Sequence, residues 1–192
     1  MQPSRRWRVD PRSWSCCLGT LRRIGCTATS YSRSPDYVTY ALFKLLHLIG
    51  LVLLVGNVTV TSVWKVFADR TGQPAIAAFA TRMVIVTDWF LTLGGVALLA
   101  VGGYGMTTVA NVPIFSTRWL ALSQALFAVA GVIWLGILVP TQAAQQRIVR
   151  AFPADLQELP AEYRRLSARW ITWGVIATLP LLAAMYLMIT RR

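Results

Sequence analysis

The sequence predicts an all-α protein: a bundle of four transmembrane helices, preceded by a basic leader that we expect to be disordered. The composition gives the first indication, because 56% of the 192 residues are apolar and 14% are charged. Soluble domains average about 45–50% apolar and about 25% charged residues. The second indication is that the apolar residues fall into four long blocks, with most of the charge between them. This distribution excludes a soluble globular domain and a coiled coil.

Each block is long enough to cross a bilayer. A helix needs about 20 apolar residues to span about 30 Å of hydrocarbon. The blocks predict spans at about 37–64, 83–109, 119–140 and 170–190. Backbone groups in lipid must pair within their own segment, so we expect helices rather than strands. Between the third and fourth spans, residues 141–169 are expected to form a short surface helix, a turn and then the start of the last span.

The first 36 residues differ in kind from the remainder. They contain seven arginines and all three cysteines, Cys16, Cys17 and Cys26, but no apolar run long enough for a signal-peptide core. The cysteines do not have a metal-binding spacing, so no metal site is predicted. We therefore divide the chain into a leader, 1–36, and a four-helix domain, 37–192. Val38 would serve as an alternative translation start. If translation begins there, the leader is not part of the protein.

Charge counts favour one orientation in a bacterial inner membrane. Four spans place both termini and the second connection on the same side. Without the leader, that side has four basic residues, and the first and third connections on the opposite side have eight. Basic residues gather in cytoplasmic loops, so both termini are expected outside. Counting three leader arginines near the first span reduces the difference to eight against seven. Loop arginines facing anionic lipid account for the net charge of +12 without a nucleic-acid partner.

Ionisable residues within a span are expensive and mark candidate sites. His47, the one histidine of the chain, lies about ten residues into the first span. A neutral imidazole can ligate haem iron, or it can hydrogen-bond a neighbouring helix and hold the bundle together. Lys44, one turn earlier on the same face, can meet an acidic group or extend to the headgroups, and we favour the second interpretation.

Three further polar residues are candidates within the spans. Asp88 lies one turn into the second span. It is either a proton-relay carboxylate or an interfacial carboxylate that pairs with Arg82 or caps the helix, and we favour the interfacial interpretation. A pair with Lys44 or His47 is disfavoured, because antiparallel spans place those residues at a different depth. Asn57 in the first span and Gln124 in the third can hydrogen-bond other helices. Five glycines in the second span are expected to permit close helix approach: Gly94, Gly95, Gly102, Gly103 and Gly105.

Several motifs resemble a bacterial family of predicted integral membrane proteins, known as domain of unknown function twenty-two sixty-nine. They are Leu42-Phe43-Lys44-Leu45-Leu46-His47-Leu48-Ile49-Gly50, Asp88-Trp89-Phe90-Leu91-Thr92, and Leu159-Pro160-Ala161-Glu162-Tyr163-Arg164-Arg165-Leu166. The resemblance covers about Val38 to Arg192. It implies a membrane architecture and no particular activity.

A more distant resemblance is to the membrane-bound haem-b protoporphyrinogen oxidases and to the copper-resistance membrane proteins. Their first helices carry a Lys-x-x-His pattern, matched here by Lys44 and His47. The resemblance implies haem b bound through His47. Those oxidases also use a lysine in the third span, where this chain has Ser123 and Gln124 instead.

Three function classes fit these observations to different degrees. We favour a non-catalytic, accessory or structural membrane protein that contacts lipid and, in addition, a second copy or a membrane complex. The alternative is a haem-b redox protein or an oxidase that uses His47. A transporter or channel is disfavoured, because the spans carry few polar residues. No phosphate-binding loop or nucleophile triad is present.

Overall fold

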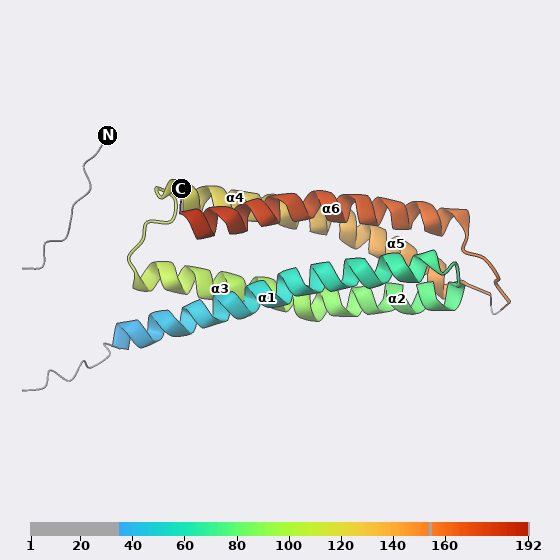
Figure 1. Ribbon diagram of the computed structural model, residues 1–192, viewed down its shortest axis with the longest axis horizontal. Helices are drawn as coiled ribbons and strands as arrows, with labels where there is room; N and C mark the ends of the chain where they lie inside the picture. Colours follow the sequence, from blue (N-terminus) through green and yellow to red (C-terminus); the bar gives the residue numbers. More distant parts are fainter. Residues whose placement is uncertain (1–34, 154, 192) are drawn as a thin grey trace, which may run out of the picture. The chain divides into compact units, whose positions relative to one another are not determined.

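The computed structural model describes residues 35–153 and 155–191 (Figure 1). These residues form helices and no strand, which confirms the all-α prediction. Residues 1–34, most of the expected leader, lie outside the described residues. The elements are α1 (Pro35–Arg70), α2 (Pro74–Thr87), η2 (Asp88–Thr92), α3 (Leu93–Val109), α4 (Arg118–Ile133), η3 (Trp134–Leu138), α5 (Val139–Arg150) and α6 (Ala161–Thr190).

The eight elements make four continuous rods, because η2 and η3 are single π-helical turns within longer helices. All four rods are long and apolar enough to cross a membrane, as predicted. Each is longer than its predicted span. The 36 residues of α1 extend over about 54 Å at about 1.5 Å per residue, well beyond the hydrocarbon thickness. All four extensions lie at the end that carries the connections 71–73 and 151–160, here called the loop end.

The expectation that the helix within residues 141–169 lies on the surface is wrong. Residues 139–150 form α5, which continues α4 and buries one face in the bundle. Pro140 does not end the helix, although it lacks an N–H and crowds the carbonyl four residues earlier. The π turn at Trp134–Leu138 ends two residues before Pro140, and the Thr141 hydroxyl donates a hydrogen bond to the Ile137 carbonyl. Pro180 likewise lies within α6, which continues to Thr190.

The rods pair as two hairpins. α1 lies along α2 and α3, and α4 and α5 lie along α6, as Figure 1 shows. The first hairpin packs most closely where glycines face the partner backbone. A Cβ added at Gly102 would lie 2.4 Å from the His47 nitrogen, and one added at Gly50 would lie 2.5 Å from the Leu99 nitrogen. The prediction of close approach is confirmed for Gly102 but is wrong for Gly94, where an added Cβ would meet nothing within 4 Å.

The two hairpins contact each other mainly towards the loop end. There α2 packs on α5 and α1 on α6, while α3 packs on neither α4 nor α6 among the described residues. The two buried apolar clusters also combine the hairpins in this half. One is built around Ala77, Val149 and Tyr163, and the other around Val84, Leu138 and Trp170. The hairpins therefore meet as a fork that is closed at the loop end.

Candidate functional site

The buried polar side chains of the described residues concentrate in the closed half of the fork. Apart from Ser123, they lie between the level of Thr92 and the loop end, and they come from all four rods. They are Asn57, Thr61 and Lys65 on α1, Thr81, Asp88 and Thr92 on the second rod, Thr141, Gln142 and Gln145 on α5, and Ser167 on α6. Such an interior is unusual for a transmembrane bundle, because polar groups in lipid are costly.

Asp88 is at the centre of one group, here called the Asp88 centre (Asn57, Asp88, Thr92 and Gln142). Asn57 Nδ2 donates to Asp88 Oδ1 at 2.8 Å, and Gln142 Nε2 donates to Oδ2 at 2.6 Å. The Thr92 hydroxyl donates to Oδ1 at 3.0 Å and accepts from Asn57 Nδ2 at 2.8 Å. The π turn contains both Asp88 and Thr92. One carboxylate therefore joins three of the four rods.

The Asp88 centre lies well inside rods that are long and apolar enough to cross a membrane. Asn57 is eight residues before Lys65, which corresponds to about 12 Å along α1. It is thirteen residues after Lys44, which corresponds to about 20 Å. Asp88 is 7% exposed, and within residues 35–153 and 155–191 no Lys or Arg forms an ion pair with it. Its three partners are neutral, so the carboxylate charge has hydrogen-bond donors but no counter-ion.

The favoured sequence interpretation of Asp88 is therefore wrong. Arg82 is exposed and is not its partner. The error arose because α2 begins at Pro74, so that Asp88 lies deep in the rod rather than one turn from its start. The depth argument against a pair with Lys44 or His47 is confirmed.

A cavity of about 250 Å³ adjoins the Asp88 centre within the fork. Its walls are mostly apolar side chains from both hairpins, with Phe127, Trp134 and Trp170 among them, and Asp88, Thr92 and Gln142 at its polar part. Trp170 is 6% exposed, and its indole Nε1 has no hydrogen-bond partner among the described residues. Leu93 and Leu135, also in the lining, are 42% and 62% exposed, so these walls of the cavity lie at the surface of the rods.

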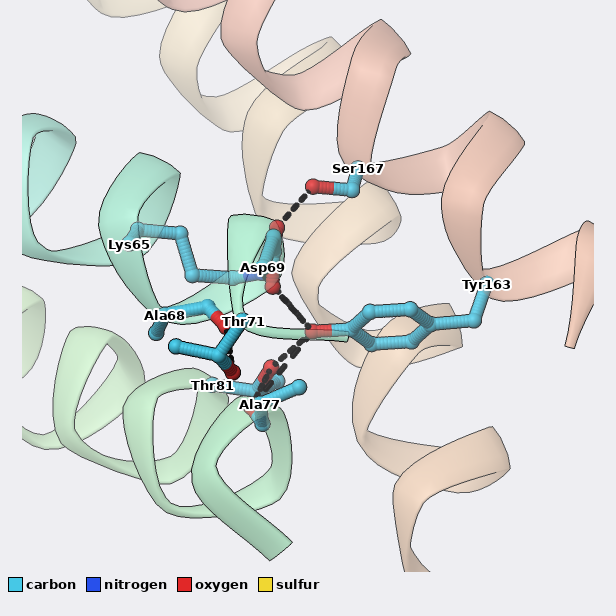
Figure 2. A network of polar contacts seen from close by, with 8 residues as sticks. All are labelled: Lys65, Ala68, Asp69, Thr71, Ala77, Thr81, Tyr163 and Ser167. Carbon is cyan, nitrogen blue, oxygen red and sulfur yellow. Dashed lines mark hydrogen bonds and ion pairs between the residues drawn. The ribbon is translucent and has the colours of Figure 1, made fainter. Parts of the chain in front are cut away.

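A second group lies at the loop end and is called the Lys65 network (Lys65, Asp69, Thr81, Tyr163 and Ser167; Figure 2). Lys65 Nζ donates to both Asp69 oxygens, at 2.7 and 2.6 Å, and to the Tyr163 hydroxyl at 2.8 Å. The Tyr163 hydroxyl lies 2.9 Å from both Asp69 Oδ1 and Thr81 Oγ1. Ser167 donates to Asp69 Oδ2.

The Lys65 network has the properties of a structural clamp. The one positive charge is matched by one negative charge, and all three ammonium protons have an acceptor. Lys65 is 1% exposed, whereas the Asp69 side chain retains 14% exposure. The network joins α1, α2 and α6 and does not line the cavity. It therefore holds the closed end of the fork rather than binding a ligand.

His47 lies in the first hairpin, away from the fork cavity. Its Nδ1 lies 2.8 Å from the Leu99 carbonyl oxygen, and the ring packs over Gly103. The cavity lining does not include His47. This arrangement fits the helix-bridging interpretation, and no feature of the described residues around His47 supports haem ligation. Lys44 is exposed, as a lysine that extends to the headgroups would be.

Gln124 makes a contact across the open part of the fork. Its Oε1 accepts a 3.0 Å hydrogen bond from the Tyr104 hydroxyl on α3, and its Nε2 donates to the Leu120 carbonyl. Gln124 therefore hydrogen-bonds both its own helix and α3.

Sequence reasoning missed the Lys65 network and the contribution of α5. Lys65 follows the predicted first span, which ends at about residue 64, and Gln142 and Gln145 lie within the expected surface segment 141–169. A signal was present in the spacing: Asn57, Thr61 and Lys65 recur at four-residue intervals on one helical face. A similar face continues from η3 into α5, where Leu138, Gln142, Gln145 and Val149 recur at intervals of three or four residues and all are buried.

Comparison with known proteins gives one result. Residues 41–192 match the model of DUF2269, described as a predicted integral membrane protein. No curated protein and no solved structure matches the chain. The matched segment contains all of the helical domain except the start of α1, including both polar groups. The chain therefore belongs to the DUF2269 family of predicted integral membrane proteins.

Proposed function

We propose that this integral membrane protein is a non-catalytic binding protein that holds a small amphipathic molecule in the fork cavity. The polar head would lie between Asp88 and Trp170, and the apolar body would lie among the aliphatic and aromatic walls. The observation that carries the proposal is that one apolar cavity is lined both by Asp88 and by Trp170, whose buried indole N–H has no hydrogen-bond partner among the described residues. Pockets of this kind, apolar with few convergent polar groups, are typical of small-molecule sites.

Hydrogen-bond capacity defines the head of the ligand. A carboxylate offers about four acceptor positions, and Asp88 uses three of them. The remaining position on Oδ2 accepts from a donor, and the Trp170 N–H donates to an acceptor. An ammonium or a hydroxyl fits Asp88, and an ammonium also supplies the missing counter-charge. The exposed lining residues Leu93 and Leu135 offer a route from the bilayer.

The test uses three probes that have similar alkyl chains and differ in the polar head: octylamine, 1-octanol and octanoate. Each is titrated calorimetrically into the protein in nanodiscs, and the heat of empty nanodiscs is subtracted. We expect octylamine to bind best and octanoate not to bind. Asp88→Asn should weaken octylamine binding about tenfold or more, because a hydrogen bond to a charged group contributes about 1.5–3 kcal/mol. Trp170→Phe should weaken the binding of 1-octanol, whose hydroxyl can accept from the indole N–H, more than that of octylamine, whose ammonium has no acceptor.

A matched pair of variants locates the site. Gly131 lines the cavity and Gly136 does not, and an added Cβ meets nothing within 4 Å at either position. Gly131→Leu should abolish binding, and Gly136→Leu should leave it unchanged. Equal binding in both variants, or no octylamine or octanol heat above that of empty nanodiscs, contradicts the proposal.

We further propose that the protein lies in the bacterial inner membrane with the loop end in the cytoplasm and both termini outside. The basic excess of the first and third connections supports this orientation. The exposed apolar side chains of the rods are those that a bilayer covers, so none of them requires a protein partner. In a cysteine-free background, Asn111→Cys should react with an impermeant maleimide in intact spheroplasts, and Glu158→Cys should react only after lysis. The reverse pattern contradicts the orientation.

A further inference from the structure

A series of buried polar side chains runs from the Asp88 centre to the Lys65 network. We call this series the polar file; it consists of these two groups together with Thr61 and Gln145. Along α1, Asn57, Thr61 and Lys65 follow each other at intervals of one turn, and all are at most 5% exposed. The file starts beside the fork cavity and ends at Asp69, whose side chain is 14% exposed at the loop end.

Gln145 occupies the middle of the file without a hydrogen-bond partner for its amide nitrogen. It is 1% exposed, and Nε2 has no partner among the described residues. On the same face of α5, Gln142 is bound to Asp88 and Val149 packs with Ala77 and Tyr163. Gln145 therefore lies between the two polar groups. A buried amide donor at this depth is costly unless water satisfies it, and the neighbouring polar side chains offer water further partners.

We propose that Asp88 exchanges protons with water at the loop end through the polar file. Water at Gln145 would connect the Asp88 centre to the hydroxyls of Thr81 and Tyr163 and then to Asp69. Protonation forms an O–H bond on Asp88 and leaves a buffer base deprotonated at the loop end, so atoms and charge balance. Uptake of the proton neutralises a carboxylate that has no counter-ion within the part of the chain that the structure describes. This inference does not depend on the proposed amphipathic ligand.

The surroundings of Asp88 support the proposal. Asn57 on α1 and Gln142 on α5 donate to Asp88, and Thr61 on α1 and Trp170 on α6 line the same cavity; none of these side chains carries a charge. On α3, Leu93 and Val96 line the cavity beside it. Of the charged side chains that follow along the packed rods, Lys65 is paired with Asp69, and Arg82, Arg147 and Arg169 are exposed. A proton is thus the neutralising species that this interior can supply without a rearrangement of the helices.

The experiment follows the carboxyl band of Asp88 by infrared spectroscopy after a pH jump, on the protein in nanodiscs. The band is identified as the one that is absent in Asp88→Asn. We expect it to appear quickly at acid pH in the unaltered chain. Gln145→Leu, and separately Thr61→Val, should slow its appearance several-fold. Ser123→Ala, which alters a buried hydroxyl outside the file, should not slow it.

Gly131→Leu separates this proposal from the binding proposal, because it fills the cavity and leaves the file intact. It should abolish octylamine binding without slowing proton exchange, and Gln145→Leu should do the reverse. Equal rates in the unaltered chain, Gln145→Leu and Thr61→Val would overturn the proposal. So would slowing by Gly131→Leu, which would indicate access through the fork, or a band that is the same at every pH.

Discussion

The hydroxyl of Tyr104 on α3 donates a 3.0 Å hydrogen bond to Gln124 on α4, across a part of the fork where these two helices do not pack. Tyr104 is 52% exposed, so the bond is not protected by surrounding side chains. In this half the hairpins are linked by the long Tyr104 side chain and not by close contact between α3 and α4.

Loss of this bond should widen the open part of the fork. In a cysteine-free background, spin labels at Val101 and Leu122, both 56% exposed, report the separation of α3 and α4. We expect Tyr104→Phe to broaden the distance distribution measured by double electron–electron resonance and to shift it outwards. Tyr186→Phe, which alters another exposed tyrosine, is the control. An unchanged distribution in Tyr104→Phe would show that the tether does not hold the hairpins.

Two glycines of the second rod should respond oppositely to alanine. At Gly102 the new Cβ would lie 2.5 Å from the Phe43 carbonyl oxygen, so α1 and α3 must separate. Overpacking of this kind costs about 1–3 kcal/mol. At Gly94 nothing lies within 4 Å, and alanine should gain up to about 1 kcal/mol of helix propensity. Melting temperatures in detergent should fall for Gly102→Ala and stay level or rise for Gly94→Ala. A similar fall in both would contradict the α1–α3 register.

Removal of one charge from the Lys65 network should be more harmful than removal of both. Asp69→Asn leaves the buried Lys65 ammonium without its counter-ion, which costs about 3–5 kcal/mol in buried pairs. The double variant Lys65→Met/Asp69→Asn leaves no unpaired charge and should recover much of that loss. Chemical denaturation in mixed micelles measures the difference, and Glu162→Gln, an exposed acid on α6, is the control. A double variant less stable than Asp69→Asn would show that the pair itself is strongly stabilising.

The Tyr163 hydroxyl should contribute to stability out of proportion to its size. It contacts Lys65, Asp69 and Thr81 within 3 Å, so Tyr163→Phe leaves several buried groups short of a partner. Such groups cost about 1–3 kcal/mol each when they are unsatisfied. We expect a clear loss in the same denaturation assay, while Tyr186→Phe, on the exposed side of α6, has little effect. Equal stability of the two variants would mean that water replaces the hydroxyl at no cost.

The sequence predicts the four spans well because hydropathy depends on the length of each apolar block and on how few charged residues it contains. Both are unambiguous here. It predicts the ends poorly. Lys65, Gln142 and Gln145 lower the local hydropathy and resemble loop residues, yet each faces another rod and is buried. Burial depends on which helix faces which, and this is set by packing rather than by composition. The α1–α3 register that places Gly102 against His47 is one example.

The partners of Asp88 could not be predicted for the same reason. Asn57 lies 31 residues before it and Gln142 lies 54 residues after it. Only the assembled hairpins bring these amides to one carboxylate. The depth argument that separated Asp88 from His47 succeeded because it needs only the antiparallel order of two adjacent spans.

The segment 110–117 joins the two hairpins at the end of the fork where they pack least. A chain cut there would still contain two complete antiparallel pairs, each closed by its own connection at the opposite end. Separately synthesised halves should insert independently and then associate through the interlocked polar end, so the protein can be treated as an intramolecular heterodimer.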